Sequence, residues 1–333
     1  MADSGPDTGH SPSAGADSPA KPGRIEFLDQ YRGFTVFLMI AVNLLAEFSI
    51  VPPWLKHATE YGSVTITDFV ITMFVFIMGV AFELTLPRSI AAKGRGRTVW
   101  RFVRRSLLLI GFGVLGSVLL KRDLIGEWGV LQTLGCAGLV ALPFMFTDTG
   151  RRTFIAVLLI AIYELIGAAG HWAWLKAHDT GHLGGIPAGL AWGGVVLLGS
   201  LCGGYIRRHD EQVFRRACVA IGVAGIGLTL VLRGRLPVSK PLVTATYVTA
   251  ATGCAASVLL LFELLRPRFA PFRWLGMNAL AIFMLHGLLL ETVLRAVRPA
   301  GSLPVVLLAG AGLLGVCLLV AGIFYWRRIF IRL

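Results

Sequence analysis

The chain has 333 residues, of which 56% are hydrophobic and 15% are charged, and its mean hydropathy is +0.74. This composition excludes an ordinary soluble globular domain and predicts a polytopic membrane protein. The net charge of +13 falls mostly in short segments between apolar runs. Such a distribution is typical of cytoplasmic loops, so no nucleic-acid partner is expected.

Residues 1–24 are rich in Pro, Gly, Ser and Asp and contain no apolar core. They are expected to form a disordered cytoplasmic tail and not a signal peptide. Residues 25–333 are expected to form one transmembrane domain.

Ten apolar stretches follow the tail, each close to the roughly 20 residues that a helix needs to cross a bilayer. The runs are continuous and do not alternate strictly, so they favour helices over a barrel, since lipid leaves backbone groups no other partner. The expected fold class is therefore an all-α, polytopic membrane helix bundle of about ten transmembrane helices. The predicted spans are 33–50, 68–87, 102–120, 128–147, 153–171, 187–206, 214–232, 242–265, 273–293 and 303–326.

The positions of the basic residues predict the orientation of these spans. More than two thirds of the 31 Lys and Arg residues lie at or beside the two termini and the even-numbered connections. Because an excess of positive charge marks the cytoplasmic side, both termini are predicted to be cytoplasmic. The chain is expected in a plasma or inner membrane, which the sequence does not distinguish from a lysosomal one.

Polar residues inside the predicted spans are costly in lipid and usually face the bundle interior or a watery cavity. Asn43, Glu164, Asn278 and His286 are such residues. Three further carboxylates lie near span ends, where snorkelling or pairing with nearby arginines is favoured. These are Glu83, Glu263 and Glu291.

The stretch PPWLKHATEYGSVTITD joins the first two spans and contains His57 and Asp68. Asp68 begins the second span, where it is suited to cap the helix or to interact with the positive end of its dipole. The same carboxylate is also suited to orient His57 through a hydrogen bond. The eleven-residue separation requires the connection to fold back, and both interpretations stay open on spacing alone.

A dense run of arginines lies between the second and third spans and includes Arg101 and Arg105. Its simplest explanation is orientation in the membrane and contact with lipid headgroups. The alternative is that these side chains hold the phosphates of an anionic cofactor. The five cysteines show no paired ligand spacing, so neither a metal site nor a disulfide framework is expected.

Six motifs occur in an order that resembles the heparan-alpha-glucosaminide N-acetyltransferase family. They are LDQYRG, MIAVN, WLKHATEYGSVTITDFVITMFVFIMG, GVLQTLG, PVSKPLVTATYV and PFRWLGMNALAIFMLH. The resemblance implies a multi-span enzyme that takes an acetyl group from cytosolic acetyl-CoA and delivers it to the amine of a glucosamine-type sugar across the membrane.

The resemblance, together with the placement of charge, also assigns residues to roles. The expected catalytic residues are His57, Asp68 and Asn43. Arg32, Arg101, Arg105, Asn278 and His286 are expected to bind acetyl-CoA, and Trp54, Lys240 and Glu164 the acceptor sugar. No metal is expected, and the Gly-rich helices permit a homo-oligomer.

Two other functions are weighed against this one. The O-acyltransferases of cell-envelope glycans share an LDGLRG-like start but carry their key histidine on the first span, where this chain has Asn43. A sugar or proton-coupled transporter would use similar buried polar residues, but no inverted repeat is evident.

The sequence departs from the family pattern in two ways. The animal lysosomal enzyme of the family has an additional luminal domain and a further span before the LD..RG element, where this chain has a short polar segment. In the PVSKPLVTATYV motif, this chain has Ser239 where Asn is usual in the family.

The chemistry leaves two mechanisms open. An imidazole is able to accept a proton from an amine near neutral pH, which makes His57 a candidate general base. The same ring is also able to attack the thioester and carry the acetyl group transiently. Asn43 or Asn278 would then donate a hydrogen bond to the developing oxyanion.

Overall fold

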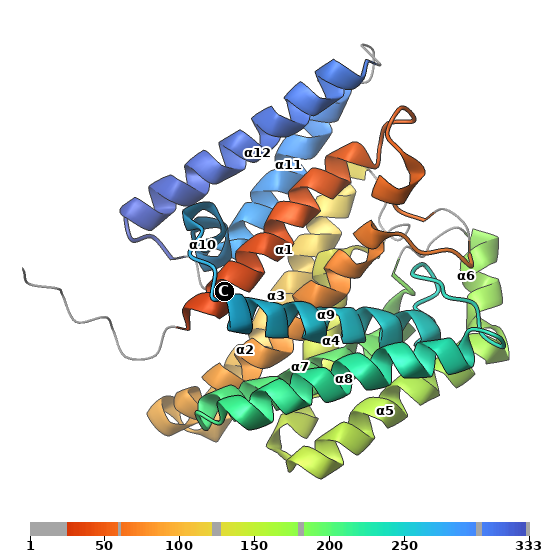
Figure 1. The fold of residues 1–333 in the computed structure, drawn as a ribbon, viewed down its shortest axis with the longest axis vertical. Coiled ribbons are helices and arrows are strands. Elements are labelled where there is room, and N and C mark those ends of the chain that lie inside the picture. Colours follow the sequence, from red (N-terminus) through yellow and green to blue (C-terminus); the bar gives the residue numbers. More distant parts are fainter. Residues whose placement is uncertain (1–24, 59–60, 122–127, 179–182, 298–301, 331–333) are drawn as a thin grey trace, which may run out of the picture.

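The computed structural model describes residues 25–58, 61–121, 128–178, 183–297 and 302–330. The predicted tail, 1–24, lies outside them. The described residues form helices and no strands, so the expected all-α class is confirmed (Figure 1). The long helices are α1 (Glu26–Leu45), α2 (Phe69–Lys93), α3 (Arg95–Lys121), α4 (Val130–Ala141), α5 (Thr149–Ile166), α7 (Gly189–Arg207), α8 (Glu211–Leu232), α9 (Ala245–Leu265), α11 (Ala279–Val297) and α12 (Leu303–Trp326).

Shorter helices lie between them. The 3-10 turns η1 (Pro53–Leu55) and η2 (Ile66–Asp68) belong to the connection between α1 and α2. The others are η3 (Leu142–Phe146), η4 (Gly167–His171), α6 (Trp172–His178), η5 (Ile186–Ala188) and α10 (Ala270–Met277).

Seven helices among the described residues are long and apolar enough to cross a membrane. They are those at Ile66–Lys93, Thr149–His178, Ile186–Arg207, Glu211–Leu232, Ala245–Leu265, Ala279–Val297 and Leu303–Trp326. Three other predicted spans also coincide with helices. Helix α1 carries Glu26, Asp29 and Arg32 in its first two turns, α3 begins with a run of arginines, and the apolar helix at Val130–Phe146 is short.

Three predicted spans are interrupted. Pro143 lacks a backbone N–H, and the fourth span turns from α-helix into 3-10 helix at that point. The fifth is broken at Gly170, which adopts φ 129°, a conformation that glycine tolerates. The ninth is divided into α10 and α11 at Asn278, whose φ of −126° and ψ of 33° are not helical.

Helices α2 and α7 form the centre of the bundle. Helix α2 packs mainly against α7 and α9, while α8 lies along α9 and α5 along α7. Cβ atoms at Gly79 or Gly199 would overlap backbone carbonyls of the facing helix, so the two glycines allow α2 and α7 to approach closely.

The bundle has two ends, which lie to the right and left in Figure 1. The right end holds the α1–α2 connection, α6 and the segment 237–244 that leads into α9, and we name it the histidine end. At the left end α1 begins and α2 ends, and we name it the arginine end. The predicted orientation places the histidine end outside and the arginine end in the cytoplasm.

Helix α10 crosses α1 at close range, and two glycines of the recognised motifs make this possible. A Cβ atom on Gly33 would overlap the carbonyl of Phe272, and one on Gly276 would overlap that of Asp29. The Gly residues of LDQYRG and WLGMN are thus explained by packing of backbone against backbone.

We expect Gly276→Ala to lower the melting temperature of the detergent-solubilised protein, because the added methyl group meets a rigid backbone atom. The matched control is Gly287→Ala on α11, where a Cβ would meet no atom within 4 Å. Alanine favours helix over glycine by roughly 1 kcal/mol. The control should therefore melt at the same temperature or higher, and an equal loss in both variants would contradict the packing argument.

Candidate active site

The α1–α2 connection folds back on the start of α2, which places His57 beside Asp68. The Thr65 and Thr67 hydroxyls both donate to the carbonyl of Lys56, at 2.6 and 2.8 Å. These bonds tie the turn at η2, just before α2, to the residue preceding His57. The fold-back that the spacing required is therefore present.

Asp68 is fully buried, and its carboxylate has several partners. Oδ1 lies 3.1 Å from His57 Nδ1. Oδ2 accepts hydrogen bonds from the backbone N–H of Thr65 at 3.0 Å and of Ala58 at 3.3 Å. The two sequence interpretations of Asp68 are thus compatible, because it both fastens the turn before α2 and contacts the His57 ring.

Lys240 joins the same cluster from the segment that precedes α9. Its Nζ lies 3.0 Å from Asp68 Oδ1 and 3.0 Å from His57 Nδ1. Its side chain is 13% exposed. Burial lowers the pKa of the Lys240 ammonium, and the adjacent Asp68 carboxylate opposes that shift. The residue expected to bind sugar is therefore paired with the predicted catalytic carboxylate.

The His57 ring is the accessible member of this cluster, with 38% of its side chain exposed. Nδ1 faces Asp68, Lys240 and the Thr67 hydroxyl, the last at 3.3 Å. No hydrogen-bond partner of Nε2 is found in the part of the chain that the structure describes. Nε2 is therefore the nitrogen that a substrate would meet.

Asn43 and His286 meet at a second polar contact between α1 and α11. Asn43 Nδ2 lies 3.4 Å from His286 Nε2. His286 Nδ1 lies 3.2 Å from the carbonyl of Phe283. Since a carbonyl only accepts, Nδ1 carries a proton, and a neutral His286 accepts from Asn43 through Nε2. The predicted catalytic role of Asn43 and the acetyl-CoA role of His286 remain predictions.

The segment 237–244 is held by α5 and α6. Tyr163 Oη and Trp172 Nε1 donate to the carbonyl of Leu242 at 2.9 and 3.0 Å. Glu164 Oε2 accepts from the backbone N–H of Ala245 at 2.7 Å, at the start of α9. The sequence predicts that Glu164 binds sugar. In the structure its carboxylate contacts the backbone at the end of the segment that carries Lys240.

Two other predicted site residues lie at opposite ends of the bundle. Trp54 is 58% exposed in η1, three residues before His57, which suits the predicted contact with an acceptor. Asn278 is buried at the α10–α11 break and donates to the carbonyl of Ile329 at 3.1 Å. It lies at the arginine end, away from His57.

The arginines predicted to hold acetyl-CoA gather at the arginine end. Arg32 and Arg101 lie close enough to Arg105 to act on it electrostatically. The buried Arg105 Nε has no hydrogen-bond partner among the described residues. Guanidinium groups brought together in this way suit the phosphates of an anionic ligand.

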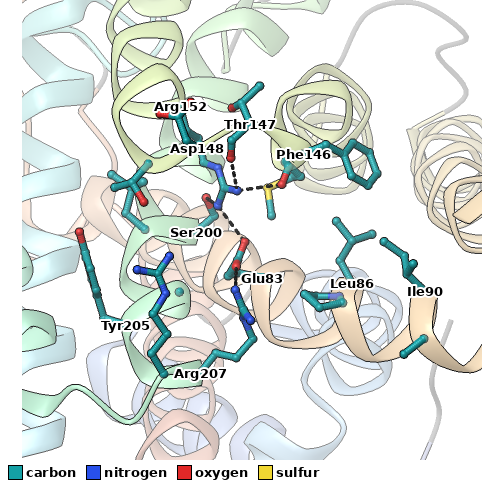
Figure 2. Close-up of a pocket in the computed structure, with 17 residues that line it drawn as sticks. Glu83, Leu86, Ile90, Phe146, Thr147, Asp148, Arg152, Ser200, Tyr205 and Arg207 are labelled. Carbon is teal, nitrogen blue, oxygen red and sulfur yellow. Dashed lines mark hydrogen bonds and ion pairs between the residues drawn. The ribbon is translucent and has the colours of Figure 1, made fainter.

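A separate cavity of about 480 Å³ lies at the arginine end between α2, α5 and α7 (Figure 2). Glu83 is at its centre and pairs with Arg152 at 2.8 Å and Arg207 at 3.0 Å. Arg152 also donates to the carbonyls of Met145 and Thr147. Glu83 of α2 thus pairs with one arginine from α5 and one from α7, and we interpret the cavity as a place where ion pairs join three helices.

Of the two behaviours expected for the carboxylates near span ends, snorkelling or pairing with an arginine, the structure shows pairing for all three. Glu83 has the partners just described, Glu263 lies 2.8 Å from Arg215, and Glu291 lies 3.2 Å from Arg295.

Several residues at the histidine end were not singled out from the sequence. Thr65 and Thr67 shape the turn that holds Asp68 and His57. Tyr247 donates from its hydroxyl to the Asp68 carbonyl at 2.7 Å, and Thr72 lies 3.2 Å from that hydroxyl. Tyr247 could have been found from the sequence, because a tyrosine within an apolar span normally needs a hydrogen-bond partner for its hydroxyl.

A known protein family is similar to the part of the chain that contains His57, Asp68 and Lys240. A family model described as "Heparan-alpha-glucosaminide N-acetyltransferase, catalytic" matches residues 24–240, which include His57, Asp68 and Lys240. The human heparan-alpha-glucosaminide N-acetyltransferase is 35% identical over 127 residues, which cover 35% of this chain and 18% of that protein. The mouse protein is 33% identical over 139 residues, which cover 37% and 20%.

The chain thus matches about a fifth of the length of either relative. The family model, in contrast, extends over well more than half of this chain. The chain belongs to the heparan-alpha-glucosaminide N-acetyltransferase catalytic family.

Proposed function

We propose that this protein is an integral-membrane acetyltransferase that moves an acetyl group from acetyl-CoA to the amine of a glucosamine-type sugar. The observation that carries the proposal is the contact of His57 with buried Asp68 inside the family-matched stretch. The acceptor binds at the histidine end, beside the exposed Trp54, and acetyl-CoA enters from the arginine end.

The His57 ring supplies the acid–base chemistry. In the tautomer that carries its proton on Nδ1, the ring donates to Asp68 Oδ1 and presents the Nε2 lone pair. Nε2 takes a proton from the neutral sugar amine as that amine attacks the acetyl carbonyl carbon. The carbon–sulfur bond breaks, and the proton passes to the leaving thiolate as CoA thiol. The ring is then neutral again.

A transient acetyl-His57 is the second route that the same geometry supports. Nε2 would attack the acetyl carbonyl and release CoA thiolate. The neutral sugar amine would then take the acetyl group from the ring, and the proton that it loses would neutralise the thiolate. Both routes need an accessible Nε2 and a fixed Nδ1, so both place His57 at the reacting atoms.

The test is reconstitution of the purified full chain in vesicles with labelled acetyl-CoA and glucosamine. N-acetylglucosamine should form in proportion to the protein. A sugar that accumulates in the vesicles unmodified would identify a transporter and overturn the proposal. If the product is an O-acetyl ester of a sugar hydroxyl and not the amide, the protein is an O-acyltransferase.

Acetyl-CoA binding at the arginine end makes a separate prediction. Replacing Arg105 with Ala should weaken acetyl-CoA binding about tenfold or more, since a charge-assisted bond to phosphate contributes roughly 1.5–3 kcal/mol. The control is Arg151→Ala, because its side chain is 80% exposed and pairs with Asp148. Calorimetric titration with acetyl-CoA measures both. Equal affinities in wild type and Arg105→Ala would exclude Arg105 from the site.

A further inference from the structure

Three groups at the histidine end lie within hydrogen-bond distance of one another. Asp68 Oδ1, Lys240 Nζ and His57 Nδ1 form a triangle with sides of 3.0, 3.0 and 3.1 Å. A simple Asp–His pair stabilises the protonated ring, because the carboxylate attracts the imidazolium. Here the carboxylate already faces an ammonium group, and the same ammonium faces the ring.

The triangle accommodates a neutral His57 in either tautomer. With the proton on Nδ1, the ring donates to Asp68 Oδ1. With the proton on Nε2, the Nδ1 lone pair accepts from the Lys240 ammonium. A doubly protonated ring is disfavoured, because its positive charge would lie against the Lys240 ammonium, whose Nζ is 3.0 Å from Nδ1.

The position of Lys240 is fixed by its segment. The Lys240 carbonyl accepts from the backbone N–H of Val243 at 3.0 Å. Val243 is fully buried with φ 53°, a left-handed conformation that is costly for a β-branched residue and persists only where the surroundings impose it. The bonds from Tyr163 and Trp172 to the neighbouring Leu242 carbonyl supply that constraint.

Two other lysines, on the α1–α2 connection and on α6, have contacts elsewhere. The Lys56 ammonium, on the same connection, donates to the carbonyl of Ser49. The Lys176 ammonium of α6 lies over the Tyr61 ring at 5.4 Å. Among the described residues, Asp68 and Lys240 are the charged groups in hydrogen-bond contact with His57.

We propose that Lys240 is a positioning residue that keeps the His57 ring neutral by sharing Asp68 with it. In this proposal Lys240 acts on the charge of His57, whereas the sequence predicts that it binds the sugar. The activity test of this role rests on the proposed acetyl transfer. For that reaction, a neutral ring has two consequences. A neutral ring with its proton on Nδ1 is available as base or nucleophile, and any imidazolium formed during turnover gives up its proton readily to the leaving thiolate.

The test follows the ring directly. Diethyl pyrocarbonate reacts with neutral imidazole, so the pH dependence of carbethoxylation at His57, measured by peptide mass spectrometry on the full chain, reports its charge state. Lys240→Met should move the midpoint for His57 upward by about one pH unit or more, because Asp68 then stabilises the imidazolium alone. Lys240→Arg keeps the positive charge and should leave the midpoint near that of wild type.

Two internal controls accompany the measurement. The exposed His178 of α6, which lies 2.8 Å from the Trp174 carbonyl through Nδ1, should keep its midpoint in every variant. The double variant Asp68→Asn with Lys240→Met removes both charges and should return the His57 midpoint toward wild type. An unchanged His57 midpoint in Lys240→Met, or an equal shift in Lys240→Arg, would overturn the proposal.

The acetyl-transfer rate gives the second readout. The acidic limb of the kcat/KM profile should move upward in Lys240→Met by the same amount as the carbethoxylation midpoint. If the midpoint moves while even the wild type transfers no acetyl group, the role of Lys240 stands and the proposed function fails. If the wild type is active and neither quantity moves, the proposed function stands and the role of Lys240 fails.

Discussion

His57→Ala should lower the rate of acetyl transfer by about 10²–10⁴-fold, the range that a positioned general base or acid contributes. The loss should appear in kcat, because the ring acts on the reacting atoms and not on the phosphates of the donor. Single-turnover assays with labelled acetyl-CoA, at saturating sugar, measure it. His178→Ala is the matched control, since it removes a histidine from the same end of the bundle without touching the cluster.

The same experiment separates the two mechanisms. If His57 carries the acetyl group, wild type incubated with acetyl-CoA and no sugar should yield an acetylated His57 peptide and release one CoA per chain in a burst. If His57 is a base, CoA release should wait for the sugar. Full activity in His57→Ala would remove the residue from either role.

Asp68→Asn should destabilise the protein by about 3–5 kcal/mol, the range observed when one partner of a buried ion pair is removed. The substitution preserves the size of the side chain but leaves the largely buried Lys240 ammonium without its carboxylate. Thermal unfolding in detergent, followed by tryptophan fluorescence, gives the comparison with wild type.

The double variant Asp68→Asn with Lys240→Met is the informative control for stability. It leaves no uncompensated charge, so it should unfold at a higher temperature than Asp68→Asn alone. Glu291→Gln breaks a pair in which the Arg295 side chain is 71% exposed, and it should cost less than about 1 kcal/mol. If the double variant is less stable than Asp68→Asn, the cost arises from the bonds to Thr65 and Ala58 and not from the unpaired ammonium.

The helical segments could be predicted from the sequence because lipid demands long apolar runs with internally bonded backbone. Their interruptions were harder to predict. Pro143 is visible in the sequence, but the break at Asn278 depends on a bond to Ile329, 51 positions away, and on the close crossing of α1 by α10. Periodicity describes a segment in isolation, whereas the break at Asn278 involves partners from elsewhere in the chain.

The candidate site shows the same division. His57 and Asp68 are near neighbours along the chain, so their contact could be weighed from spacing. Lys240 lies 183 positions from His57, and its place in the cluster depends on how α5, α6 and α9 hold one short segment. Sidedness, the acceptor and the residues that bind acetyl-CoA remain predictions from charge placement and family resemblance.

Helix α2 differs from the outer helices in its surroundings. Over its most apolar window 83% of α2 is buried inside the protein, against 11% for α8 and 17% for α12. Asp68 directly precedes the first turn of α2, so the cluster lies on the most buried of the seven candidate spans. We therefore expect changes in acyl-chain length or membrane thickness to act first on α8 and α12, and less on the geometry around His57.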